Sequence, residues 1–231
     1  MGAPYFMQKS FIQTAAMIAL FSFASSAWAQ KSWNAPKLVT VYCSGCHGVD
    51  GNTQLPYFPK LAGLDAAYAE KKMTAFREPS GPPVDEALWW TLKVMGSKKA
   101  AGNVTRQERM NMEGVAHAET PEQIKAAVDW YAKQTPAHGH AESGALVMQG
   151  KELFEKGIPA QKVLACATCH GPDAAGRGAA PRLAGQNAEY LIDQLEKFSK
   201  GDRKHSPEMT MVTRDLDADQ ARAAAAYLQT R

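Results

Sequence analysis

Residues 43–47 read CSGCH and residues 166–170 read CATCH, so two cysteines followed directly by a histidine occur twice in this chain. These motifs contain all four cysteines of the sequence. Cys-x-x-Cys pairs occur in zinc sites, in thiol oxidoreductases and at haem attachment sites. The histidine behind each second cysteine favours haem, because two thiols can add to its vinyl groups while the next residue reaches the iron. The motifs therefore predict covalent haem at Cys43, Cys46, Cys166 and Cys169, with His47 and His170 as iron ligands; zinc and a dithiol couple are the alternatives.

The first 29 residues have the order of features found in a secretory signal. A lone Lys9 precedes an apolar run that starts at Phe11, and small residues lead to Ala27-Trp28-Ala29. An uncleaved anchor helix is the alternative, although the apolar run is short for a membrane span. We expect residues 1–29 to be a signal peptide and the mature protein to be periplasmic, either free or associated with the membrane.

The chain is an internal duplication. Residues 59–76 read PKLAGLDAAYAEKKMTAF and align without a gap with residues 181–198, PRLAGQNAEYLIDQLEKF. Similarity at a fixed offset indicates two copies of one structural unit. No alternating strand pattern occurs, and apolar residues recur at helical spacing near the end of each repeat: Ile124, Ala127, Val128 and Tyr131 in the first, and Ala221, Ala224, Ala225 and Leu228 in the second. We therefore predict an all-α protein with one domain at residues 30–134, a linker at 135–144 and a second domain at 145–231. Each domain is expected to surround one covalently bound haem, so that the protein carries two haem c groups.

Each repeat closes with a helix whose start can be read from the sequence. Thr120 and Asp217 are each followed by a glutamine three residues later, which is the pattern of a capping box, and they lie 97 residues apart. At the same offset Met112 falls on Met209. A thioether is a soft, neutral ligand that favours ferrous iron. Met112 and Met209 are therefore the predicted second axial ligands of the two irons.

Alternatives to this ligation exist in the sequence. Methionines often fill gaps in a core, and Met110 and Met211 lie near the predicted pair without sharing its offset. His117 follows Met112 by five residues, but Arg214 occupies the matching place in the second repeat. We interpret His117 as a surface histidine.

The first repeat carries an insert. Phe76 and Met112 are 36 residues apart, whereas Phe198 and Met209 are 11 apart, so the insert has about 25 extra residues at about 77–106. It includes a predicted short helix with two tryptophans, Trp89 and Trp90, and a basic cluster in and just after it: Lys93, Lys98, Lys99, Arg106 and Arg109. We predict a docking patch for an acidic partner here; the alternative is a helix that only covers the haem.

With these residues in place, the chain resembles a dihaem cytochrome c of the c4 type. The resemblance covers nearly all of the mature protein and is carried by residues 165–198, ACATCHGPDAAGRGAAPRLAGQNAEYLIDQLEKF, their looser copy in the first repeat, and the methionine ahead of each closing helix. It implies that the carbonyls of Pro59 and Pro181 orient the two histidines. It also implies a periplasmic electron carrier between a quinol-oxidising complex or dehydrogenase and a terminal acceptor such as an oxidase.

Several functional classes are disfavoured. The formal net charge of +3 gives no electrostatic support for nucleic acid binding. Attachment uses all four cysteines, so none is left to ligate a catalytic haem, and we expect neither enzymatic activity nor a small-molecule substrate. The expected partners are redox proteins in the periplasm or at the inner membrane. The alternatives are a cytochrome subunit permanently bound to a periplasmic dehydrogenase and, less favoured, a dihaem redox enzyme.

Overall fold

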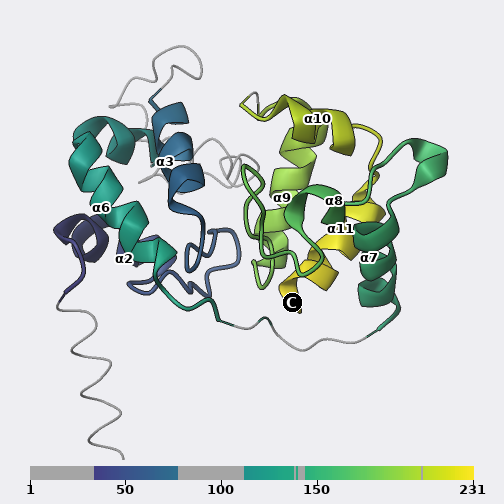
Figure 1. Cartoon of the computed structure of the whole chain (residues 1–231), viewed down its shortest axis with the longest axis horizontal. Helices are drawn as coiled ribbons and strands as arrows, with labels where there is room; N and C mark the ends of the chain where they lie inside the picture. Colours follow the sequence, from purple (N-terminus) through teal and green to yellow (C-terminus); the bar gives the residue numbers. More distant parts are fainter. Residues whose placement is uncertain (1–33, 78–111, 138, 140–143, 204) are drawn as a thin grey trace, which may run out of the picture.

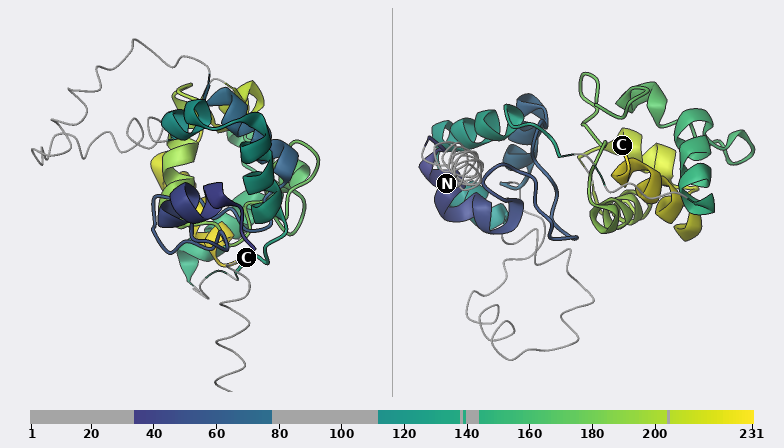
Figure 2. Two further views of the ribbon diagram at one scale, coloured as in Figure 1. Left: turned by 90° about the vertical axis from the view of Figure 1, so that its left-hand side faces the viewer. Right: turned by 90° about the horizontal axis from the view of Figure 1, so that it is seen from below.

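Two groups of helices, one from each repeat, lie side by side in the computed structural model (Figures 1 and 2). The structure describes residues 34–77, 112–137, 139, 144–203 and 205–231. In these segments β-structure is limited to two isolated bridges, so the prediction of an all-α fold is confirmed. No helix among them has the length and apolar character needed to cross a membrane. The predicted signal peptide, nearly all of the insert with its basic cluster, and Met110 lie outside the described residues.

The first repeat begins with a continuous helical stretch over residues 37–47, which contains the first Cys-x-x-Cys-His motif. Its helices are η1 (Val39–Cys43), α2 (Ser44–His47), α3 (Ala66–Ala75), a helical segment at 112–118, and α6 (Pro121–Ala132). Helix α3 packs against α6. The apolar stripe that the sequence places on α6 faces inward: Ile124, Ala127, Val128 and Tyr131 are all buried.

The second repeat has the same order of helices. They are α7 (Ala145–Lys156), the short η3 (Pro159–Gln161), α8 (Ala167–His170), α9 (Ala188–Ser199), α10 (Pro207–Thr213) and α11 (Ala218–Gln229). Helix α11 packs against both α7 and α9, around a fully buried Phe154. One difference is local: a loop at residues 157–165 separates α7 from the cysteine motif, whereas the first repeat enters its motif directly from the opening helix.

Both closing helices start at the predicted capping boxes. Gln123 N donates to Thr120 Oγ1 at 3.3 Å, and Thr120 N donates to Gln123 Oε1 at 2.8 Å. The corresponding distances at Asp217 and Gln220 are 2.8 and 3.1 Å. Each box satisfies backbone N–H groups that a helix end otherwise leaves without partners. The 97-residue offset read from the sequence therefore joins structurally equivalent positions.

The crossing of α7 and α11 depends on Gly150. A Cβ atom placed at Gly150 would lie 1.9 Å from Ala223 O and 2.8 Å from Tyr227 Cβ. The absence of a side chain therefore lets the two helices of the second repeat approach backbone to backbone.

We expect Gly150→Ala to force α7 and α11 apart and to lower the free energy of unfolding by about 1–3 kcal/mol, the usual cost of overpacking a core. Gly114→Ala is the matched control, because a Cβ at Gly114 meets nothing within 4 Å. In the helical segment 112–118 this change should be neutral or stabilising by up to about 1 kcal/mol. Chemical denaturation of both variants checks the prediction, and equal stability of the two would contradict it.

Candidate functional site: two haem attachment turns

Each Cys-x-x-Cys-His motif forms a single helical turn. Cys43 and Cys166 stand at the N-caps of α2 and α8, so the second cysteine and the histidine lie within the turn that follows. The next residue is a glycine with positive φ, 76° at Gly48 and 79° at Gly171. Glycine adopts this conformation without a steric penalty. The chain can therefore turn sharply behind each histidine.

The two histidine rings are buried and held in the same way. His47 Nδ1 lies 2.9 Å from Pro59 O, and His170 Nδ1 lies 2.8 Å from Pro181 O. Only about 6% of either histidine is exposed. Since a carbonyl oxygen can only accept, Nδ1 carries the proton and Nε2 keeps its lone pair. This is the form of imidazole that binds a metal.

Burial also keeps these rings neutral. Desolvation lowers the pKa of both His47 and His170, and the hydrogen bonds to the proline carbonyls oppose that shift only in part. A neutral imidazole is required for metal ligation. The electrostatic environment therefore suits both histidines to an axial position on iron.

The loop behind the first motif is anchored to the closing helix α6. Trp130 Nε1 donates to Val49 O at 2.7 Å, and the Tyr131 hydroxyl donates to Gly48 O at 2.9 Å. Gly51 O in turn accepts from the N–H groups of Leu61 and Ala62 just after Pro59, as Ala174 O does for the equivalent residues of the second repeat. These bonds tie the histidine turn and the proline loop to each other and to the core.

The four cysteines form no disulfide and no cluster. None of the four is paired with another cysteine. Within the described segments, no group of three or more metal-binding side chains comes together. Burial raises the pKa of Cys43 and of Cys166 to about 11. A thiol of raised pKa is a poor nucleophile for exchange, which disfavours the dithiol couple. The described residues also do not assemble the four ligands of a structural zinc site.

Met112 and Met209, the predicted distal ligands, occupy aligned positions in the two repeats. Met112 begins the described helical segment 112–118, and Met209 lies on α10; both are partly buried. Thr213 Oγ1 donates to Met209 O at 2.7 Å and steadies this helix. Met211, the nearby alternative, has 67% of its surface exposed. His117 is exposed, in agreement with its interpretation as a surface residue.

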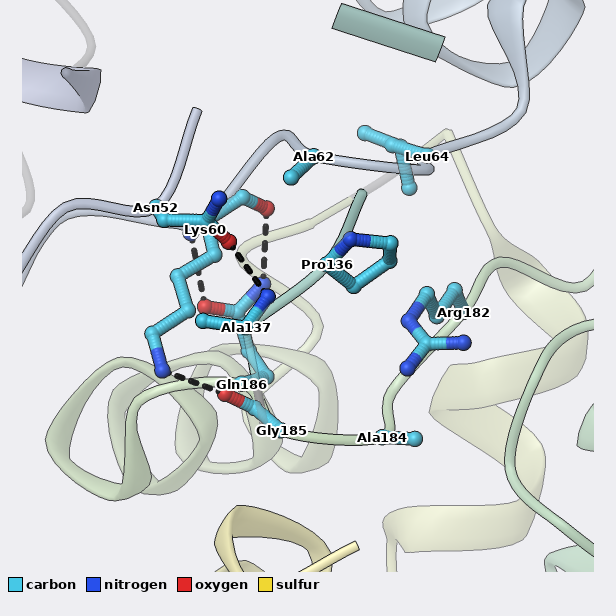
Figure 3. Close-up of a pocket in the computed structure, with 10 residues that line it drawn as sticks. All are labelled: Asn52, Lys60, Ala62, Leu64, Pro136, Ala137, Arg182, Ala184, Gly185 and Gln186. Atoms are coloured by element: carbon cyan, nitrogen blue, oxygen red, sulfur yellow. Dashed lines mark hydrogen bonds between the residues drawn. The ribbon is translucent and has the colours of Figure 1, made fainter. Parts of the chain in front are cut away.

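Sequence reasoning missed a polar cluster between the two repeats. The pocket in Figure 3 is lined by Lys60, Arg182 and Gln186, among others. Arg182 Nε is buried and has no hydrogen-bond partner among the described residues. The signal was in the aligned repeats: Lys60 and Arg182 are basic at the same place, directly after the two prolines. A buried Nε without an acceptor, on a side chain that is otherwise only partly buried, can donate to an anionic group such as a haem propionate.

Comparisons with known proteins agree with this geometry. The family model described as Cytochrome c matches residues 34–134 and again residues 147–231. Cytochrome c4 of Stutzerimonas stutzeri is 32% identical over 178 residues, which cover 76% of each chain. A protein of Thiomonas intermedia named thiosulfate dehydrogenase electron acceptor is 29% identical over 233 residues, covering 95% of this chain and 93% of its own length. The crystal structure of reduced cytochrome c4 from Pseudomonas stutzeri superposes with a TM-score of 0.66 at 28% identity, covering 83% of this chain and 94% of that one.

The chain therefore belongs to the cytochrome c family, as a tandem, dihaem member of the cytochrome c4 type. It carries two covalently bound haem c groups, and its class is that of dihaem electron-transfer cytochromes.

We expect Tyr131→Phe to lower the free energy of unfolding by about 1–3 kcal/mol, because the carbonyl of Gly48 loses the donor that lies 2.9 Å away. The loop behind His47 should loosen with it. Tyr42→Phe is the control, since Tyr42 is 59% exposed and its change should be within about 0.5 kcal/mol of zero. Denaturation followed at the haem absorption band measures both, and a Tyr131→Phe protein as stable as the control would contradict the anchoring role.

Proposed function

We propose that this protein is a periplasmic electron shuttle between a quinol-oxidising complex or dehydrogenase and a terminal acceptor such as an oxidase. One observation carries the proposal: each repeat holds a buried, neutral histidine directly behind a cysteine pair, with its Nδ1 bonded to a proline carbonyl at 2.9 or 2.8 Å. Such a ring has the orientation and the neutral form that permanent ligation of iron requires.

The residues that would hold the two haems follow from the repeats. The covalent bonds would be made by Cys43, Cys46, Cys166 and Cys169; the proximal ligands would be His47 and His170, and the distal ligands Met112 and Met209. The haem iron supplies a reversible one-electron change between the ferric and ferrous states.

The chain's own part is to bind and insulate this couple. Burial lowers the pKa of both histidines and so favours the neutral form that ligation requires, and the proline carbonyls fix their orientation. Methionine on the remaining axial position would leave no place for a substrate to bind, which supports a carrier without catalytic activity. Export by the N-terminal 29 residues would place this carrier in the periplasm, where haem c proteins meet their partners.

A second candidate is a cytochrome held permanently by a dehydrogenase. A solved chain named thiosulfate dehydrogenase (TsdBA), which is 33% identical, favours it, because the match covers 82% of this chain but only 36% of that longer one. Purification from native membranes and periplasm separates the two: a free shuttle elutes alone, whereas a bound subunit elutes with its dehydrogenase. A dihaem enzyme, the least favoured candidate, would bind ligands such as cyanide rapidly at one open iron.

Mass spectrometry of the denatured mature protein tests the attachment. We expect the mass of the chain from Gln30 plus two haems, because thioether bonds survive denaturation. Replacing Cys166 and Cys169 by Ser should remove one haem and leave the first site loaded. A mass equal to the bare polypeptide would overturn the haem proposal, and a retained N-terminal segment would overturn the proposed cleavage.

Replacement of each distal methionine tests the ligation. Met112→Ala and Met209→Ala should each remove about half of the sulfur-to-iron charge-transfer absorption and lower one of the two reduction potentials, because axial ligands tune haem potentials over about 0.8 V. A redox titration followed by visible spectroscopy measures both effects.

Met110→Ala and Met211→Ala are the matched controls and should leave both potentials nearly unchanged. The 67% exposure of Met211 is the structural reason in the second repeat. Loss of the methionine signature in a control variant instead would show that the assigned ligand is wrong by two residues. Retention of it in all four variants would mean that another methionine is the ligand. Absence of it from the unmodified protein would point to histidine ligation and revive the enzyme candidate.

A further inference from the structure

The side chain of Gln186 in the second repeat is paired with the backbone of Lys60 in the first. Gln186 Oε1 accepts from Lys60 N at 2.8 Å, and Gln186 Nε2 donates to Lys60 O at 3.0 Å. Lys60 is 9% exposed and Gln186 is 8% exposed. Figure 3 shows this pairing at the boundary between the repeats. A side chain of one domain thus satisfies both polar groups of one backbone residue in the other, away from water.

The N–H of Lys60 belongs to the same peptide group as the carbonyl of Pro59. That carbonyl is the acceptor of His47 Nδ1 at 2.9 Å. The three groups therefore form one continuous chain of hydrogen bonds, from the histidine ring through a single peptide to Gln186 Oε1. In such chains each bond polarises the next, and burial strengthens the effect.

We propose that Gln186 is a positioning residue for the first haem and that, through the Pro59–Lys60 peptide, it lowers the reduction potential of that haem. Acceptance of the peptide N–H makes the carbonyl a stronger acceptor for His47 Nδ1–H. A stronger bond at Nδ1 makes the imidazole a better electron donor at Nε2, which favours ferric iron. The inference rests on the proposed function, since it takes His47 as an iron ligand.

The position of the first repeat that aligns with Gln186 offers no such bond to the second site. In the aligned repeats the position of Gln186 is occupied by Leu64, whose side chain can neither accept nor donate a hydrogen bond. Gln186 therefore couples the second repeat to the first site, and its aligned residue cannot couple the first repeat to the second site in the same way. Two haems with equivalent axial residues would in this way receive different potentials, and the second repeat would influence the redox state of the first.

A purely mechanical role is the competing explanation. Asn187 also crosses the boundary, where its Nδ2 donates to Leu55 O at 3.0 Å and to Phe58 O at 2.8 Å. Lys60 Nζ adds a bond to Gly185 O at 2.7 Å. The Asn187 side chain bonds neither the N–H of Lys60 nor the carbonyl of Pro59, and the Asn187 backbone N–H, which donates to Gln186 Oε1 at 3.0 Å, is kept when the side chain is changed. It is therefore the control for loss of contacts between the repeats.

The test is a redox titration of Gln186→Leu followed by NMR, with the first haem identified by contacts of its methyl groups to residues of the first repeat. We expect the potential of the first haem to rise, so that its ratio of oxidised to reduced form at a fixed potential falls by up to about tenfold, or about 59 mV for one electron. In the reduced protein the His47 Nδ1–H resonance should move upfield, while that of His170 stays in place.

Two further variants separate the proposed effect on His47 from a general loss of contacts between the repeats. Asn187→Ala should leave the His47 resonance and the first potential nearly unchanged. Gln186→Glu keeps an acceptor at Lys60 N–H, with a stronger charge, and should move the His47 resonance downfield even if the leucine variant does not fold. An unmoved His47 resonance in the Gln186 variants, or an equal shift in Asn187→Ala, would overturn the inference. Failure of the proposed function would be distinct, because the unmodified protein would then lack two low-spin haem signals.

Discussion

The arrangement of both haem sites depends on the hydrogen bond from each histidine Nδ1 to a proline carbonyl. This bond determines which ring nitrogen keeps a lone pair, and it joins the cysteine turn to a loop eleven or twelve residues further along the chain. The surrounding backbone holds the two partners of this bond in place. Positive-φ glycines turn the backbone behind each histidine. The carbonyls of Gly51 and Ala174 each accept two backbone N–H bonds from the proline loops and hold those loops within reach of the histidines.

Duplication has kept this arrangement twice while the surroundings diverged. In the first repeat α6 anchors the histidine turn through Trp130 and Tyr131. At the aligned positions of α11 stand Tyr227 and Leu228, and the crossing with α7 at Gly150 is the tight contact there. The two domains therefore stabilise equivalent sites by different packing, which allows their properties to be tuned separately.

The boundary between the repeats contains buried polar groups, although apolar contacts alone could hold two domains together. Lys60, Gln186 and Asn187 are all buried, and each of their bonds across the boundary joins a side chain to a backbone group. Leaving any of these groups without a partner would be costly, so the bonds fix one relative arrangement of the loops beside the two histidines.

Local sequence determined most of the fold and of the attachment sites. The duplicated Cys-x-x-Cys-His motifs, the capping boxes at Thr120 and Asp217 and the apolar stripes of α6 and α11 act over a few residues, so their spacing alone predicts them. The burial of His47 and His170, the unpartnered Arg182 Nε and the pairing of Gln186 with Lys60 were decided by the tertiary structure. These join residues up to 126 positions apart, and no local propensity records which loop of one repeat meets which loop of the other.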